Sequence, residues 1–239
     1  MKINKEKCIG CKQCIPYCPM GAIRQVDKKC MINQDICVEC YVCFRSNICK
    51  EEAFEKTLLG WPRIIRHIFS DPKKIHKTTG IYGRGTEEMK TNDVTNRFEI
   101  GDVGFTIDVG RPGIGTSFQE IEKITMALAK LNIEFENKNP ITIKMSNKKT
   151  GKISNDIIKE RVLSAIIEIK TKEDKLVQVI NTLKDVAKEI NTVFSVGCIG
   201  KVKINGEIPI KSILDKAGIY YRPNGKINIG LAKNKWWEK

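Results

Sequence analysis

Cysteine is unevenly distributed along this chain, because nine of its ten cysteines lie within the first 49 of 239 residues. Eight of the nine form two regular runs. The first run is Cys8, Cys11, Cys14 and Cys18, followed by Pro19, and the second is Cys37, Cys40, Cys43 and Cys49. An even number of cysteines spread over a small secreted chain would indicate disulfides, whereas one-sided crowding at regular spacing favours metal ligation.

The spacing within the runs indicates which metal site to expect. In each run two residues separate the first three cysteines, and the fourth follows after three or five residues. Such a loop can offer three thiolates to three corners of one [4Fe–4S] cube, and the fourth ligand must come from elsewhere. Structural zinc usually takes two separated pairs of cysteines, which two three-cysteine loops match poorly. The pattern therefore favours iron–sulfur clusters over zinc or disulfides.

Residues 1–60 resemble the bacterial-type 2[4Fe–4S] ferredoxin family, above all in the run CIGCKQCIPYCPMGAI. In that family the fourth cysteine of each run ligates the cluster of the other run. The resemblance implies two [4Fe–4S] clusters, the first held by Cys8, Cys11, Cys14 and Cys49 and the second by Cys37, Cys40, Cys43 and Cys18. The chain departs from the family in the five residues FRSNI before Cys49 and in Lys50, which stands where the family has proline.

Two cysteines fall outside the runs. Cys30 lies in KKCMINQD, a short strand-like stretch, and is predicted to be a buried thiol rather than a ligand. Cys198 lies in TVFSVGCIG and is predicted to be a small core residue of a strand.

Residues 61–100 form a predicted connector. The stretch RIIRHIF predicts a short helix that ends near Asp71-Pro72. A polar stretch follows in which Gly80, Gly83 and Gly85 flank Tyr82 and Arg84. A long polar loop is usually either functional or an exposed linker, and both interpretations stay open here.

Residues 101–239 show regular patterns. Alternation predicts strands over 103–109, 141–145, 162–170 and 192–199, and capping residues predict helices that begin at Ser117 and Thr171. The order is βαββαβ, the split βαβ plan of ferredoxin-like α/β sandwiches, followed by a short helix near 210–217 and a hairpin at Asn224-Gly225. The predicted fold class is α+β, with a 2[4Fe–4S] domain over 1–60 and this sandwich over 101–239.

The loop over 110–116 is the best candidate for a ligand site in the second half. It joins a strand to a helix N-terminus, where free amide groups favour an anion. An anion or substrate site would use Arg84, Arg111, Gly113, Gly115 and Thr116. The loop has neither the Walker nor the dinucleotide pattern, and a tight structural turn is an equal alternative.

Charge and hydropathy limit the function classes. The formal net charge is +14, which favours an acidic partner protein or a small anionic substrate. The lysines are scattered and no nucleic-acid-binding motif accompanies them, so nucleic acid is not favoured as a partner.

No apolar run is long enough to span a membrane, and no secretory signal begins the chain, so we expect a cytoplasmic protein. Cubane loops of this kind suggest an anaerobic organism.

A second resemblance concerns the run KTNDVTNRFEIGDVGFTIDVGRPGIGTSFQEIEK together with AGIYYRPNGKINIGL. Both are similar to a portion of 6-hydroxynicotinate reductase and related archaeal and clostridial iron–sulfur proteins. The resemblance implies a subunit of a ferredoxin-dependent oxidoreductase, but it assigns no catalytic residue. Two function classes follow: an electron-transfer protein or subunit that serves a redox partner, and a binding, assembly or redox-sensing module with structural clusters.

Overall fold

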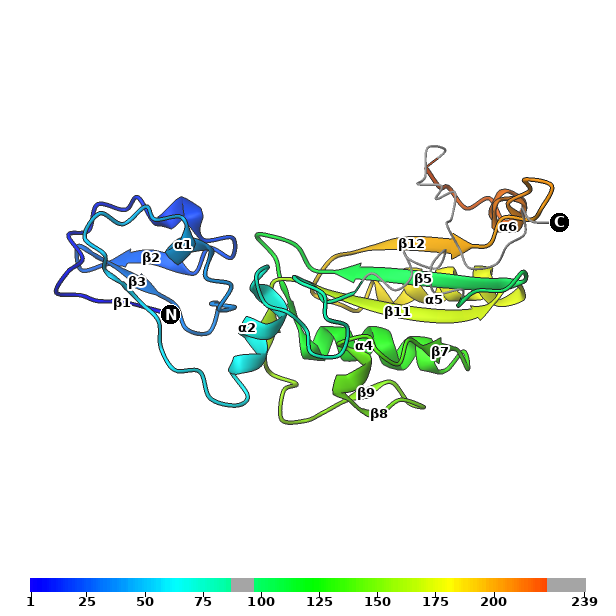
Figure 1. Ribbon diagram of the computed structural model, residues 1–239, viewed down its shortest axis with the longest axis horizontal. Helices are drawn as coiled ribbons and strands as arrows, with labels where there is room; N and C mark the ends of the chain where they lie inside the picture. The colour runs from blue at the N-terminus through cyan, green and yellow to red at the C-terminus, as the bar shows by residue number, and fades with distance from the viewer. Residues whose placement is uncertain (87–96, 223–239) are drawn as a thin grey trace.

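The computed structural model describes residues 1–86 and 97–222, which form two units joined by a short helix (Figure 1). The first unit contains both cysteine runs, and the second contains a four-stranded sheet covered by helices. The hairpin predicted at Asn224-Gly225 lies outside the described residues.

Short antiparallel strands frame the first unit. Strand β1 (Lys2–Ile3) pairs with β4 (Phe54–Glu55), and β2 (Ile23–Val26) pairs with β3 (Lys29–Ile32). Because β1 and β4 come from the two ends of the unit, their pairing closes it. The 3-10 turn η1 (Ile15–Tyr17) lies in the first cysteine run, and helix α1 (Val42–Arg45) lies in the second.

The two cysteine runs repeat one backbone path at an offset of 29 residues, the separation of Cys8 and Cys37. Asn4 and Asn33 each begin a turn in which the side-chain oxygen accepts the amide two residues further on, at 2.8 and 2.9 Å. The carbonyl oxygen of each asparagine also accepts the amide of the first cysteine of its run at 3.0 Å. Asparagine suits this turn because its side chain substitutes for a backbone acceptor. The runs can therefore be compared position by position.

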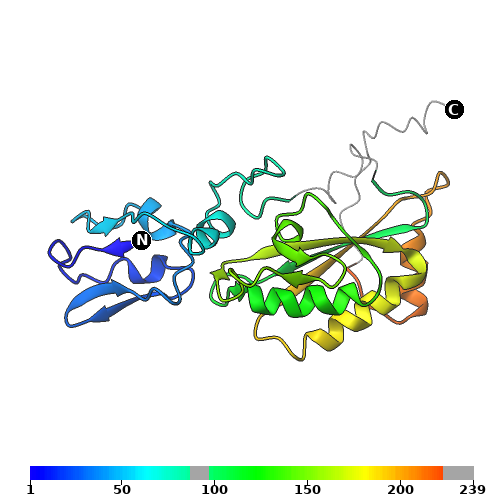
Figure 2. The ribbon, with the colours of Figure 1, turned by 90° about the horizontal axis from the view of Figure 1, so that it is seen from below.

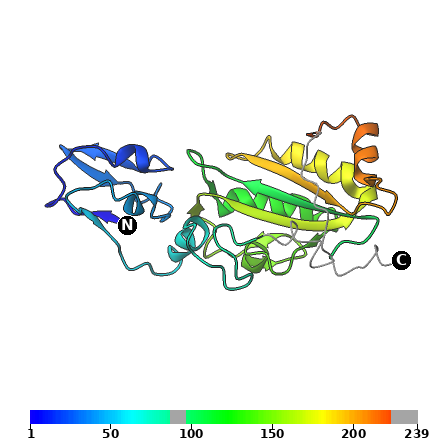
Figure 3. The same cartoon turned by 45° about the horizontal axis from the view of Figure 1, so that its top comes forward.

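A fully antiparallel sheet forms the centre of the second unit. Its strands stand in the order β12 (Phe194–Gly200), β5 (Asp102–Val109), β11 (Ala165–Lys172) and β7 (Glu134–Phe135). This is the spatial order fourth, first, third, second along the chain, as a split βαβ arrangement requires. Helices α4 (Phe118–Ala129) and α5 (Leu176–Val186) cover one face together (Figure 2). Helix α6 (Pro209–Lys216) lies beside the end of α5 (Figure 3).

The core lies between this sheet and its helices. The core residues of β5 and α4 alternate or recur at helical spacing, and they are Val103, Phe105, Ile107, Val109, Phe118, Ile121, Ile124 and Leu128. The connecting helix α2 (Ile64–Ser70) adds Ile65 and Phe69, and the Phe69 ring meets the Phe118 ring edge-on at a centroid distance of 5.4 Å. Helix α2 is thus packed into the core of the second unit.

The predicted strand over 141–145 is wrong. Residues Thr142–Lys144 form the 3-10 turn η2, and β7 supplies the second strand of the sheet. The buried Asn139 accounts for the difference, because its side chain accepts the amide of Ile141 at 2.8 Å and donates to the Ile166 carbonyl of β11 at 3.1 Å. These two bonds fold the chain into a turn at the sheet edge.

The helix starts were predicted with mixed success. Ser117 caps α4 as expected, since its hydroxyl accepts the Glu120 amide at 3.3 Å. The expected cap at Thr171 is wrong, because β11 runs through that residue and the 3-10 turn η3 (Glu173–Lys175) precedes α5.

Two further antiparallel pairs are outside the main sheet. They are β6 (Thr116–Ser117) with β10 (Arg161–Val162) and β8 (Met145–Asn147) with β9 (Lys152–Ile153).

Candidate metal centres

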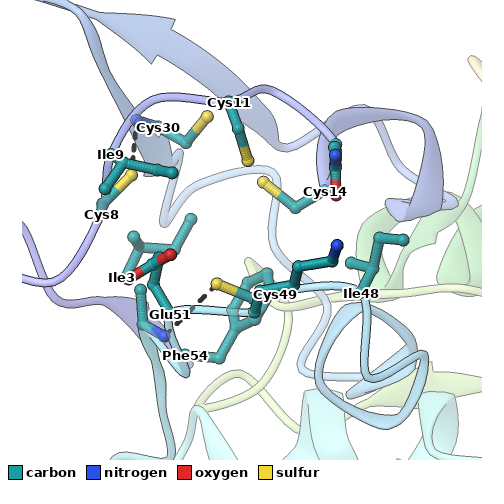
Figure 4. A pocket seen from close by; sticks show the side chains of 13 residues that line it. Ile3, Cys8, Ile9, Cys11, Cys14, Cys30, Ile48, Cys49, Glu51 and Phe54 are labelled. Atoms are coloured by element: carbon teal, nitrogen blue, oxygen red, sulfur yellow. Dashed lines mark hydrogen bonds between the residues drawn. The ribbon is translucent and has the colours of Figure 1, made fainter.

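Five thiols line a cavity of about 80 Å³ in the first unit (Figure 4). They belong to Cys8, Cys11, Cys14, Cys30 and Cys49. Figure 4 shows Cys49 across the opening from Cys11 and Cys14, so thiols from both cysteine runs face one space. Apolar side chains complete the wall and include Ile3, Ile9, Ile48 and Phe54.

The other four cysteines of the runs line a second cavity of about 20 Å³. They are Cys18, Cys37, Cys40 and Cys43, and their neighbours in the wall include Met1, Met20, Ile23, Ile32, Glu39 and Tyr41. The structure thus places the fourth cysteine of each run in the cavity of the opposite run.

The two rings of thiols match the ligands that [4Fe–4S] clusters take in number and chemistry. Across residues 1–86 and 97–222, no three His, Cys, Asp or Glu side chains converge as ligands of one metal ion. A cube takes one thiolate at each of its four iron corners, so its ligands must stand apart around a cavity. Four run cysteines around each cavity meet that requirement in number, in chemistry and in spread.

Backbone amides donate hydrogen bonds to the sulfur atoms of Cys18 and Cys49, which are the fourth cysteines of the two runs. The amide of Ala22 donates to Cys18 Sγ at 3.1 Å, and the amide of Ala53 donates to Cys49 Sγ at 3.4 Å. Each donor lies four residues after its cysteine, so the repeat extends to these contacts. Amide donors to cluster sulfur stabilise negative charge and influence the reduction potential.

A short helix and a turn accommodate the two additional residues between Cys43 and Cys49. Helix α1 occupies part of the insertion, and Asn47 takes the left-handed conformation with φ +51°. The Ser46 hydroxyl donates to the Cys43 carbonyl at 2.8 Å and fixes the turn. Cys49 therefore still lines the first cavity despite the two additional residues.

Burial raises the pKa of several of these thiols above its usual value. Burial raises the pKa of Cys14 to about 12, with the neighbouring Cys30 as the next cause. Burial likewise raises the pKa of Cys40 to about 11 and that of Cys43 to about 12. Iron must displace these protons, because only the thiolate ligates.

Cys30 is buried, and Cys198 is partly buried. Cys30 is 1% exposed, lines the first cavity and donates its amide to Cys8 Sγ at 3.4 Å. The sequence predicted its burial but not its place among the thiols of the first cavity. Cys198 packs against the core of the second unit, and burial raises its pKa to about 12.

A buried carboxylate stands beside the second cavity. Glu39 is fully buried, and its side chain accepts the Met1 amino group at 2.7 Å and Arg63 Nη2 at 2.6 Å. Two cations therefore compensate one buried anion between Cys37 and Cys40. Sequence reasoning did not single out this residue, and its only signal was an acidic residue inside a C-x2-C spacing.

Helix α2 attaches the second cysteine run to the second unit. Arg66 Nη1 donates to the carbonyl oxygens of Gln34 at 3.0 Å and Cys37 at 2.9 Å, while Arg66 Nε donates to the Glu160 carboxylate of the second unit. His67 Nδ1 lies 3.0 Å from the Glu39 carbonyl oxygen. The backbone of the second run is thus bonded to the helix that packs into the other core.

The predicted anion loop packs against the first unit. The Gly113 amide donates to the Pro19 carbonyl at 2.6 Å, and a Cβ on Gly115 would lie 2.6 Å from Met20 Cε. Pro19 and Met20 directly follow Cys18, so the loop meets the wall of the second cavity. Gly115 requires its left-handed φ of +64° and the absence of a side chain for this approach.

The remaining members of the predicted anion site differ in their surroundings. Thr116 is buried in β6, where it pairs with Val162. Arg84 Nη1 lies 3.3 Å from the Asp108 carboxylate, and Arg111 is exposed. Arg84 is thus paired with a carboxylate, and an anion site at this loop stays a prediction.

Comparisons with known proteins concern the first unit. A family model described as a 4Fe–4S binding domain matches residues 1–24. Ferredoxin-1 of Rhodobacter capsulatus is 45% identical over 40 residues, which are 17% of this chain and 62% of that protein. The first unit is a ferredoxin-type segment. The match to a 4Fe–4S binding domain supports [4Fe–4S] binding by this segment, and the likeness to Ferredoxin-1 supports a role in iron–sulfur electron transfer.

A second relative of this ferredoxin-type segment is a subunit of a larger assembly. Pyruvate synthase subunit PorD of Methanothermobacter marburgensis is 44% identical over 41 residues, which are 17% of this chain and 47% of that protein. The chain thus spans less than two thirds of the length of either relative.

No solved structure matches it significantly. Among the described residues, no helix is long and apolar enough to cross a membrane.

Proposed function

We propose that this chain relays electrons through two [4Fe–4S] clusters to an acceptor bound by its second unit. The first cluster takes Cys8, Cys11, Cys14 and Cys49, and the second takes Cys18, Cys37, Cys40 and Cys43. The observation that carries the proposal is the division of the eight thiols of the runs between two cavities of one small unit.

The second unit is well placed to receive electrons from the second cavity. The loop over 110–116 meets Pro19 and Met20, which lie in the wall of that cavity. Because Pro19 and Met20 belong to that wall, an acceptor near this loop would lie close to the second cluster. Arg66 holds the two units together, because it donates hydrogen bonds to the Cys37 carbonyl and to the Glu160 carboxylate.

When bound, each cube accepts and returns one electron at a time. The residues of the chain hold the cube, exclude water and compensate charge. Apolar walls formed by Ile3, Ile48 and Phe54 at the first cavity lower the local dielectric. The amides of Ala22 and Ala53 donate to ligating sulfur and favour the more negative, reduced cluster.

The partner and the acceptor belong to this proposal as well. One relative is, by its name, a subunit of a synthase, which supports an assembly of this chain with a catalytic subunit. The resemblance of the second unit to 6-hydroxynicotinate reductase supports a subunit of a ferredoxin-dependent oxidoreductase. The exposed Arg111, beside the contact of the two units, would favour a small anionic substrate there.

A second candidate is a binding, assembly or redox-sensing module with structural clusters. The observation in its favour is the attachment of the second cysteine run to α2 by Arg66 and His67. A cluster in that run would then order the contact between the units, and its loss would release them.

Reductive titration of anaerobically prepared protein, followed by electron paramagnetic resonance, separates the two candidates. Relay predicts two S = 1/2 signals that interact, appear on reduction and disappear on reoxidation. Clusters that resist reduction, or that break down when reduced, would favour the structural role. A Cys40→Ala variant is the matched control, because it should retain one signal and lose the interaction.

A further inference from the structure

We propose that Cys30 tunes the first cluster, because its thiol donates a hydrogen bond to Cys14 Sγ and thereby raises the reduction potential of that cluster. Cys30 acts through Cys14 and is therefore a positioning residue rather than a ligand. The inference rests on the proposed relay and assigns a role in it to a residue that belongs to neither cysteine run.

Strand β3 brings Cys30 into the wall of the first cavity. The residue is 1% exposed and lines that cavity together with the four proposed ligands of the first cluster. Its amide donates to Cys8 Sγ at 3.4 Å, and its thiol forms a side-chain hydrogen bond with the Cys14 thiol. Figure 4 shows Cys30 at the edge of the opening beside Cys8 and Cys11. Cys30 thus contacts two proposed ligands while four run cysteines remain for the cube.

The repeat of the two runs shows what distinguishes this position. At the offset of 29 residues the equivalent of Cys30 is Met1, which is also 1% exposed and lines the second cavity. A thiol carries a hydrogen that it can donate, whereas the thioether of methionine carries none. The two cavities therefore have a sulfur-containing side chain at the same place, and only the one at the first cavity is a donor.

The direction of the hydrogen bond follows from ligation. Cys14 has no proton once it binds iron, since only the thiolate ligates. Cys30 keeps its proton, because four other cysteines occupy the four corners of the first cube. The Cys30 thiol therefore donates and Cys14 Sγ accepts. A donor to cluster sulfur stabilises the negative charge that reduction adds, so the reduction potential of the first cluster rises.

The first test is a reductive titration of the loaded full-length protein, followed by electron paramagnetic resonance. Cys30→Val fills the space without a donor, and Cys30→Ser keeps a donor. Met31→Leu is the matched control, because Met31 is the next residue of β3 and belongs to the wall of neither cavity. The same substitutions in a Cys40→Ala background, which should retain the first cluster alone, assign the midpoint potential.

We expect Cys30→Val to lower the midpoint potential of the first cluster only. At a fixed potential the ratio of reduced to oxidised first cluster should fall about 3-fold, which is about 30 mV for one electron. Cys30→Ser should restore most of the potential, and Met31→Leu should match the wild type. All of these variants made in the wild-type chain should contain about eight iron per chain.

Infrared spectroscopy of the S–H stretch is a second readout that does not depend on a potential. In the loaded wild type Cys30 and Cys198 are the cysteines outside the two ligand sets, so two S–H bands are expected. Cys30→Val should remove one band and Cys198→Ala the other. The Cys30 band should move to lower frequency when the first cluster is reduced, because the accepting sulfur becomes more negative. The Cys198 band should not move.

Separate results would overturn the tuning role and the relay. An unchanged midpoint potential in Cys30→Val with full iron content would make Cys30 a packing residue only. If Cys30→Val does not bind its clusters, the wild-type spectrum decides, because a loaded chain without a Cys30 S–H band would have Cys30 as a ligand. If the wild type contains clusters that no reductant reduces, the relay itself is wrong.

Discussion

The two cysteine runs share a backbone but differ in their surroundings. Position 9 of the first run is a solvent-exposed isoleucine, and the equivalent position 38 of the second is a buried valine. Gly10 has φ +74° and lies so close to the Lys28 carbonyl that a Cβ could not fit, whereas its equivalent Glu39, at φ +54°, carries a buried carboxylate.

This comparison separates what a cysteine run must do from what its environment adds. Both runs begin with the same asparagine turn and both deliver three thiols to a cavity. The first faces solvent, and the second is bonded to α2 and to Met1. We therefore interpret the first site as the external one and the second as the internal one.

The largest expected effect comes from removing one ligand in each run. Cys11→Ala and Cys40→Ala should each lower bound iron from about eight to about four per chain, because each removes one cube. Only Cys40→Ala should also make the segment around α2 susceptible to limited proteolysis, since that run is bonded to α2. Equal protease sensitivity of the two variants would contradict the distinction between external and internal sites.

Neutralising the buried carboxylate should affect stability next. Glu39→Gln leaves the Met1 amino group and Arg63 without their anion, which should cost about 3 kcal/mol of stability. The denaturant concentration at which cluster absorbance is lost should fall accordingly. The exposed Glu51→Gln is the control and should leave that midpoint unchanged. Similar midpoints in the two variants would show that the pairing at Glu39 is not important.

The contact between the units can be probed at two glycines of one loop. Both Gly113→Ala and Gly115→Ala strain a left-handed residue, at about 1 kcal/mol each. Only the second also meets Met20 and the Val162 carbonyl, which lies 3.0 Å from the added Cβ. Amide exchange at Ala22, whose N–H donates to Cys18 Sγ, should therefore accelerate in Gly115→Ala alone. Equal acceleration in Gly113→Ala and Gly115→Ala would show that backbone strain causes the effect, and not the contact between the units.

The smallest effect is expected at the fifth thiol of the first cavity. Cys30→Ala should retain the full iron content, because the four cysteines of the proposed set remain. Cys14→Ala, in the same cavity, should lose the first cluster. Iron loss in Cys30→Ala as large as in Cys14→Ala would make Cys30 a ligand and require a new ligand set.

Local patterns predicted much of the fold. The alternating residues of β5 and the Ser117 cap of α4 were read correctly, because their signals are short-range. The strand expected over 141–145 failed because Asn139 bonds to a strand distant in sequence. No local pattern reports such a bond.

In the candidate site, too, local sequence patterns predicted some features and missed those that depend on distant contacts. The spacing of the cysteines and the family resemblance predicted two sets of four thiols, and each set lines one cavity, whereas their ligation of clusters stays a prediction. Glu39, Arg66 and Met20 could not be predicted, because their roles arise from contacts between segments that are far apart in the sequence. The same holds for the contact of Gly115 with Met20, which joins segments far apart in the sequence.

Quantitation of iron and acid-labile sulfide in protein purified without oxygen tests the central claim most directly. Two cubes on eight thiolates predict about eight iron and about eight sulfide per chain. Protein that folds but contains essentially neither would contradict the account, and about four of each would leave one of the two cavities without its cluster.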